Sequence, residues 1–114
     1  MTKIYHNPRC GTSRTALQML EEHGLKPEII EYLKTPPSRA ELIQLIKESG
    51  LSVREAIRSK EPVFQELQLD NPALTDDQLI DAMMAHPILI NRPFVVTDKG
   101  TRLCRPATEL TAIL

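Results

Sequence analysis

The sequence lacks a long hydrophobic run, an excess of either charge and a close pair of cysteines. No apolar stretch approaches the about 18 residues that a membrane-spanning helix needs, and the N-terminus has no signal-peptide pattern. We therefore expect a cytoplasmic protein with no membrane partner. The formal net charge of -1 gives no broad basic surface for nucleic acid. Any anion site must therefore come from a local group of basic side chains.

The only two cysteines, Cys10 and Cys104, are far apart in the chain. In a reducing compartment, such spacing favours free thiols over a structural disulfide. A metal site is disfavoured because His6 is the only other ligand-type side chain close to Cys10 in the sequence. The sequence also lacks internal repeats, low-complexity tracts and linkers. With 114 residues, 41% of them apolar, residues 1–114 are expected to form a single domain.

The most informative stretch is residues 6–14, HNPRCGTSR. An apolar segment at residues 3–5 predicts a buried strand, and a helical pattern begins around Thr12, so Cys10 falls at a strand-to-helix turn. The free N–H groups of a helix start stabilise negative charge, which favours a thiolate. His6, Arg9 and Arg14 add positive or switchable charge that acts in the same direction. The pattern predicts a reactive thiol.

An alternative for Cys10 is the role of a small buried hydrophobic residue, because free cysteine is among the most buried residue types. Its polar and basic neighbours and its position at a turn favour the reactive role.

The first part of the chain predicts a βαβ unit. A helix capped by Thr12 or Ser13 is expected to run to about His23 and to end at Gly24. A second strand follows at residues 27–32. Because the joins are short, the two strands are expected to be parallel.

The rest of the chain predicts a helical insertion followed by a ββα half. Capping-box patterns begin at Ser38, Ser52 and Thr75, and the second of these helices is expected to carry Arg58. A short helix is expected near residues 63–67. Strands at residues 91–97 and 101–104 form a hairpin, and a last short helix follows Pro106. The predicted fold is α/β, with a mixed sheet.

Three arginines stand apart from the general surface charge: Arg58, Arg92 and Arg105. Arg92 and Arg105 lie at the two ends of the predicted hairpin, so antiparallel pairing brings them to the same end of the sheet. A guanidinium matches a tetrahedral oxyanion well. From the pattern alone, a surface role for each arginine stays open beside an anion-binding role.

Four segments of the sequence, including residues 6–14, resemble the glutaredoxin-coupled arsenate reductases. The matching blocks occur in order and with the expected spacing at residues 6–14, 32–37 (YLKTPP), 91–96 (NRPFVV) and 100–106 (GTRLCRP), and the resemblance runs from residue 3 to the end of the chain. Relatives without arsenate activity share HNPRC but often differ after it, so GTS at residues 11–13 favours the reductase branch.

The resemblance implies a thioredoxin-like fold with a helical insertion and a cis bond between Arg92 and Pro93. It implies that Cys10 is the nucleophile, that His6 helps to activate it, and that Arg58, Arg92 and Arg105 bind the oxyanion. The implied activity is reduction of arsenate to arsenite through a covalent Cys10–arsenic intermediate. Glutathione is the implied reductant and glutaredoxin the implied partner, with no metal or bound organic cofactor.

Other functions use similar residues. A tyrosine phosphatase loop needs arginine where this chain has Ala16, and Arg14 comes too early. A glutaredoxin-like disulfide reductase would have a second cysteine at Ser13, so this chain could at most act with a single thiol. A regulator that binds RNA polymerase, as relatives of this fold do, typically uses the same missing cysteine pair.

Reduction of arsenate takes two electrons, and Cys10 needs a partner thiol to supply them. Cys104 is the only other candidate in the chain. We expect Cys104 to be packed or incidental rather than resolving, so that the partner thiol comes from glutathione.

Overall fold

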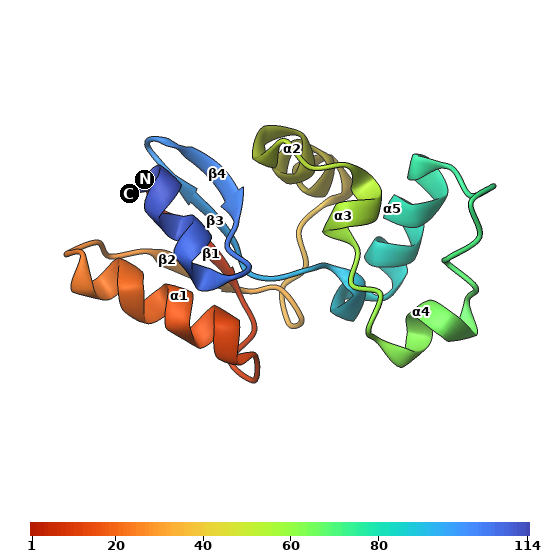
Figure 1. Ribbon diagram of the computed structural model, residues 1–114, viewed down its shortest axis with the longest axis horizontal. Coiled ribbons are helices and arrows are strands. Elements are labelled where there is room, and N and C mark those ends of the chain that lie inside the picture. The colour runs from red at the N-terminus through yellow and green to blue at the C-terminus, as the bar shows by residue number, and fades with distance from the viewer. The chain divides into compact units, whose positions relative to one another are not determined.

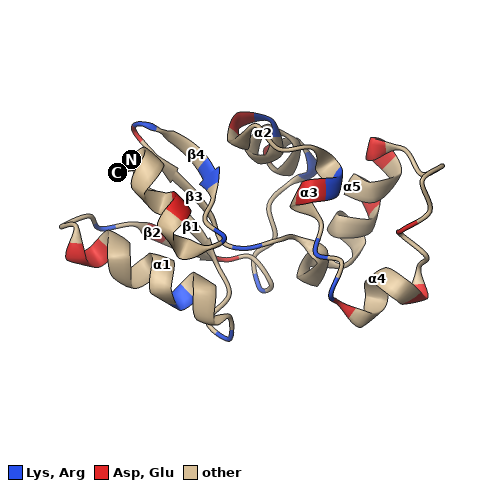
Figure 2. Cartoon of the chain, viewed as in Figure 1, with Lys and Arg blue, Asp and Glu red and all other residues tan.

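The computed structural model describes every residue from Met1 to Leu114 and divides the chain into two units (Figure 1). One unit combines Met1–Thr35 with Arg92–Leu114, and the other consists of Pro36–Asn91. The second unit corresponds to the predicted helical insertion. Basic and acidic residues are mixed along both units (Figure 2).

The first unit is built on a four-stranded mixed sheet with the order β2-β1-β3-β4. The strands are β1 (Lys3–His6), β2 (Glu28–Glu31), β3 (Phe94–Thr97) and β4 (Gly100–Leu103). β1 pairs in parallel with β2 and antiparallel with β3, which in turn pairs antiparallel with β4. The predicted βαβ and hairpin pairings are therefore confirmed.

Helix α1 (Gly11–Glu22) connects β1 to β2. It ends at Glu22, with His23 as the C-cap residue. Gly24 follows with a φ of +79°, which glycine adopts easily, and the N–H of Leu25 donates to the Leu20 carbonyl over 3.1 Å. The last helix, η2 (Ala107–Ile113), is a 3₁₀ helix that contacts α1 and β4. These elements share a core of buried residues, which are Ile4, Ala16, Leu20, Val95, Cys104, Leu110 and Ile113.

The start of α1 differs from the prediction. Cys10 is the N-cap residue, rather than Thr12 or Ser13. The helix therefore begins one residue earlier than Thr12. The Ser13 side chain bonds to groups at the end of β1 and is not available as a cap.

The second unit contains α2 (Arg39–Ser49), α3 (Val53–Ala56), α4 (Pro62–Glu66), α5 (Asp76–Ala85) and the 3₁₀ helix η1 (Pro87–Leu89). Within this unit, α5 contacts α2, α3 and η1. Its buried apolar residues include Leu42, Leu45, Ile46, Val53, Ala56, Leu79, Ile80, Met83 and Leu89. In neither unit is a helix long and apolar enough to cross a bilayer.

Side-chain caps start these helices where the sequence predicts them. Ser38 accepts a hydrogen bond from the backbone N–H of Glu41, and full capping boxes form at Ser52 and Thr75. The prediction that α3 carries Arg58 is wrong, because the helix stops at Ala56. The next residue, Ile57, is extended and forms a β-bridge with Ile90, which draws the chain out of the helix.

Candidate active site

Cys10 lies where the turn after β1 meets the first residue of α1, and its side chain is 9% exposed. Two hydrogen bonds shape the turn: Asn7 O accepts from the Cys10 N–H, and Asn7 Oδ1 accepts from the Arg9 N–H, both over 3.0 Å. Arg14 closes the turn from the helix side, donating from Nη1 to the Pro8 carbonyl over 2.9 Å. These hydrogen bonds fix the turn that carries the thiol, which is the side chain of the N-cap residue.

The hairpin of β3 and β4 brings two arginines together at one end of the sheet. Phe94 pairs with Leu103, so Arg92 and Arg105 lie just beyond the paired ends of the two strands. Arg105 donates from Nη1 to the carbonyl oxygen of Arg92 over 3.1 Å. The same nitrogen lies 3.6 Å from the Cys10 sulfur. The predicted closeness of the two arginines is confirmed.

The electrostatic surroundings of Cys10 favour its thiolate. Burial raises the pKa of the thiol, but the backbone N–H of Ser13 and the guanidinium groups of Arg105 and Arg92 oppose this effect. Together they lower the pKa of Cys10 to about 7. A substantial fraction of the thiol is therefore ionised near neutral pH, which makes it a competent nucleophile.

His6 lies at the end of β1, and its ring bonds to Ser13 rather than to Cys10. The His6 Nδ1 and the Ser13 Oγ are 2.6 Å apart. Burial lowers the pKa of His6, Glu31 opposes this, and Arg14 adds to the lowering. Near neutral pH the ring is therefore mainly uncharged, and the expected positive charge beside the thiol comes from the arginines.

Comparison with known proteins identifies the family. Residues 5–113 match the model of the ArsC family. The chain belongs to the ArsC family. An arsenate reductase of Rhizobium meliloti is 58% identical over 111 residues, which cover 97% of this chain and 79% of that protein. An arsenate reductase of Escherichia coli is 55% identical with the same coverage.

A solved structure, described as an arsenate reductase from Vibrio cholerae, superposes on this chain with a TM-score of 0.95 at 45% identity. The match covers 99% of this chain and 97% of the other. The family and the thioredoxin-like α/β fold implied by the sequence motifs are therefore confirmed. The cis peptide expected between Arg92 and Pro93 is present. A second one, between Arg105 and Pro106, was not predicted.

Four of the five residues that the ArsC resemblance implied belong to the first unit: His6, Cys10, Arg92 and Arg105. Arg58 belongs to the helical unit, where its Nε lies 3.1 Å from the Glu61 carboxylate and its backbone N–H donates to the Leu89 carbonyl. The geometry described above therefore concerns Cys10, His6, Arg92 and Arg105. The role of Arg58 stays a prediction from the family resemblance.

Cys104, the second thiol of this ArsC chain, is fully buried in the core of the sheet unit. Burial raises its pKa to about 12. Arg102 lowers the pKa and Glu109 raises it, both by less than burial does. Such a thiol is almost entirely protonated near neutral pH and is a poor nucleophile. This environment fits the packed role expected from the sequence.

Sequence reasoning missed the roles of Ser13 and Asn7, both buried polar residues of the turn. Neither residue type is chemically reactive by itself, and their partners become visible only when β1 and α1 are in place. The signal available was their position inside the ArsC motif, on either side of Cys10.

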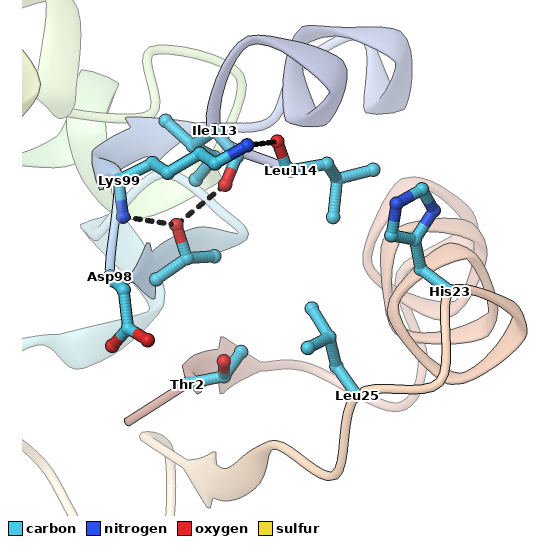
Figure 3. A pocket seen from close by; sticks show the side chains of 8 residues that line it. Thr2, His23, Leu25, Asp98, Lys99, Ile113 and Leu114 are labelled. Carbon is cyan, nitrogen blue, oxygen red and sulfur yellow. Dashed lines mark hydrogen bonds between the residues drawn. The ribbon is translucent and has the colours of Figure 1, made fainter.

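A separate, mainly apolar pocket of about 140 Å³ lies in the same unit, beyond the far end of α1 (Figure 3). Its lining includes His23 and Leu25, which follow α1, and Thr97, Lys99 and Leu114 from the C-terminal part of the chain. The Lys99 ammonium donates to the Leu114 carbonyl over 2.6 Å. The pocket includes none of the predicted site residues. The ArsC chain also has no group of three His, Cys, Asp or Glu side chains able to hold a metal ion.

Proposed function

We propose that this chain reduces arsenate to arsenite, with the Cys10 thiolate as nucleophile. The observation that carries the proposal is the Arg105 guanidinium 3.6 Å from the Cys10 sulfur at a helix start. Relatives that are 55% and 58% identical over almost the whole chain are named arsenate reductases. The family relationship supplies the substrate, and the geometry supports the chemistry.

Arsenate is a tetrahedral oxyanion, so a thiolate approaching it meets like charge. Arg92 and Arg105 offset this repulsion and present several N–H donors to the arsenate oxygens. Arg58 is proposed as a third arginine of the site, on the strength of the family resemblance. The guanidinium groups of Arg92 and Arg105 also stabilise the thiolate before arsenate binds, so these two residues serve both reactants.

The proposed cycle begins when the Cys10 sulfur bonds to arsenic and one arsenate oxygen leaves as water. Glutathione then attacks the adduct, and As(V) accepts two electrons to become As(III). These electrons come from the sulfurs of Cys10 and glutathione, which end as one mixed disulfide when the sulfur–arsenic bond breaks and arsenite leaves. Overall, arsenate and two thiols give arsenite, one disulfide and water. A glutaredoxin thiol then takes the glutathione by thiol–disulfide exchange, which regenerates the Cys10 thiol.

Glutathione is proposed as the second thiol because the chain offers no suitable partner of its own. Ser13 stands where a resolving cysteine of a Cys-x-x-Cys pair would be. Cys104 is buried and protonated. Because the cycle needs a reducing pool of glutathione and glutaredoxin, we propose that the protein works in the cytoplasm.

A coupled assay tests this function. The protein is mixed with arsenate, glutathione, glutaredoxin and glutathione reductase, and oxidation of NADPH is followed. We expect turnover that depends on arsenate and on glutaredoxin, and that is lost in Cys10→Ser. Replacing glutaredoxin with thioredoxin should abolish turnover.

The same assay separates the alternative functions. NADPH oxidation with a small disulfide in place of arsenate, and none with arsenate, would instead support a single-thiol disulfide reductase. The regulatory alternative would be supported if the protein showed neither activity and RNA polymerase were recovered with it in a pull-down.

A further inference from the structure

The hydroxyl of Ser13 connects the end of β1 with the first turn of α1. The Ser13 Oγ lies 2.6 Å from His6 Nδ1 and accepts a hydrogen bond from the Asn7 backbone N–H over 3.1 Å. Ser13 is 0% exposed, His6 6% and Asn7 4%. Water therefore has little access to these groups, and each depends on the others for its hydrogen bonds.

The bonding capacity of the hydroxyl fits this pair of partners. A serine hydroxyl offers one O–H donor and two lone pairs. One lone pair accepts from Asn7, because a backbone N–H can only donate. The ring of His6 then either accepts the serine proton or donates its own, and in both tautomers one hydrogen bond joins the two side chains. The link therefore requires no charge on the histidine.

Ser13 also faces Cys10, through its backbone. Cys10 is the N-cap of α1 and Ser13 is the third residue of the helix, which is the position whose N–H normally bonds to an N-cap side chain. The Cys10 side chain makes no cap hydrogen bond. The Ser13 N–H nevertheless lowers the pKa of Cys10, because a charged sulfur attracts a donor more strongly than a thiol does.

We propose that Ser13 is a positioning residue through which His6 acts on Cys10. Its hydroxyl, held by His6 and Asn7, aims its backbone N–H at the Cys10 sulfur and so stabilises the thiolate. His6 acts as an uncharged hydrogen-bond partner, without direct contact with the sulfur. The inference rests on the proposed function only for the identity of Cys10 as the nucleophile.

Other charged groups also face this arrangement. Arg105 and Arg92 act directly on the sulfur of Cys10, and neither residue is substituted in the Ser13 and His6 variants. Glu31 from β2 and Arg14 from α1 act on His6 with opposite effects on its charge. A test must therefore separate the Ser13 pathway from a direct effect of histidine charge.

The experiment measures the pH dependence of Cys10 alkylation by iodoacetamide, followed on the Cys10 peptide by mass spectrometry. We compare wild type with Ser13→Ala, His6→Ala and the double variant. Ser13→Ala should raise the Cys10 pKa by about one unit, which lowers the thiolate fraction at pH 7 about fivefold. His6→Ala should produce a similar shift, and the double variant should shift no further than the larger single effect.

Two further variants sharpen the result. His6→Asn places an uncharged amide near the position of Nδ1 and should largely restore the wild-type titration. Thr15→Ala removes another hydroxyl of the first turns of α1, one that bonds to the Gly11 carbonyl, and should change nothing. Circular dichroism checks the fold of each variant. If Ser13→Ala does not fold, the comparison of His6→Asn with His6→Ala decides.

An unchanged titration in folded Ser13→Ala would overturn the proposal, as would single shifts that add in the double variant. A His6→Asn variant that titrates like His6→Ala would also overturn it, because charge would then be required. Alkylation needs no arsenate. Failure of the coupled assay with the expected alkylation result would therefore refute the proposed function and leave the role of Ser13 intact.

Discussion

The Arg105 guanidinium lies 3.6 Å from the Cys10 sulfur, although the two residues are 95 positions apart in the sequence. The contact exists because β1 and β3 are neighbours in the sheet and the hairpin returns β4 beside β3. The N-terminal half of the chain thus supplies the nucleophile and the C-terminal half supplies the cation. A cation so close to the sulfur stabilises the thiolate and is placed to meet an oxyanion approaching it.

Arg105→Ala should weaken both functions of this contact. We expect the Cys10 pKa to rise by about one unit, and kcat/KM for arsenate to fall about 10- to 100-fold, because a charge-assisted donor is lost. Arg105→Lys should recover part of the thiol pKa but little of the arsenate affinity, since an ammonium has no planar pair of donors. Thiol titration and steady-state kinetics measure the two effects.

The matched control for that variant is Arg102→Ala. Arg102 lies on β4, three residues before Arg105, and pairs at 3.5 Å with the half-exposed Glu109. Its removal should leave arsenate kinetics near wild type. Equal losses in the two variants would mean that Arg105 acts only through general surface charge.

The reaction rate should follow the ionisation of Cys10. Because the thiolate is the nucleophile and its pKa is about 7, kcat/KM should rise with pH through about 7 and level off above it. A pH profile that falls across this range would indicate that a protonated group controls the rate instead.

The same pKa shift affects stability in a predictable direction. The Cys10 pKa is lower in the folded protein than in the unfolded chain, so the unfolded chain binds more protons between the two values. The stabilisation from the thiolate is fully present above the unfolded value and is lost as pH falls through about 7. Relative to Cys10→Ser, the wild-type free energy of unfolding should therefore increase from pH 7 to pH 9. Urea unfolding at these pH values measures the difference.

Cys104 should contribute to packing and not to turnover. We expect Cys104→Ala to reduce the free energy of unfolding by about 1–2 kcal/mol through the small cavity left in the core, with most activity retained. The native protein should expose one reactive thiol to a thiol reagent, and the unfolded protein two. A Cys10–Cys104 disulfide isolated during turnover, and lost together with activity in Cys104→Ser, would show that the protein resolves its own intermediate.

The capping box of α5 should stabilise the helical unit without affecting the thiol. Thr75→Ala removes the hydroxyl that accepts from the Gln78 N–H, and we expect a loss of about 1 kcal/mol. Ser59→Ala, at an exposed turn residue, is the matched control and should cost little. Urea unfolding and Cys10 alkylation measure the two properties. A shift in Cys10 reactivity would contradict this separation.

Local patterns predicted much of the fold, because the responsible interactions are close in sequence. The boxes at Ser52 and Thr75 depend on residues three positions apart, and the cap at Gly24 depends on one residue with positive φ. The meeting of Arg92 and Arg105 followed from the hairpin, since a short turn fixes which strand ends coincide. These features require little knowledge of tertiary structure.

The remaining details depend on contacts between elements. The sequence predicts Thr12 or Ser13 as the cap of α1 because hydroxyls commonly cap helices, but the Ser13 hydroxyl bonds to His6 and Asn7 instead. The helix before Arg58 ends early because Ile57 pairs with Ile90, more than 30 residues away. Competition of this kind between local and distant partners is decided by the packed structure.

The most direct test of the account is to identify the covalent species formed on the protein. Wild-type protein is incubated with arsenate and glutathione in the absence of glutaredoxin, quenched with acid and analysed by peptide mass spectrometry. The account predicts an arsenate-dependent adduct, carrying arsenic or glutathione, on the Cys10 peptide, and its absence from Cys10→Ser. An adduct that forms without arsenate, that lies on Cys104, or that persists in Cys10→Ser would contradict the assignment of Cys10 as the nucleophile that attacks arsenic.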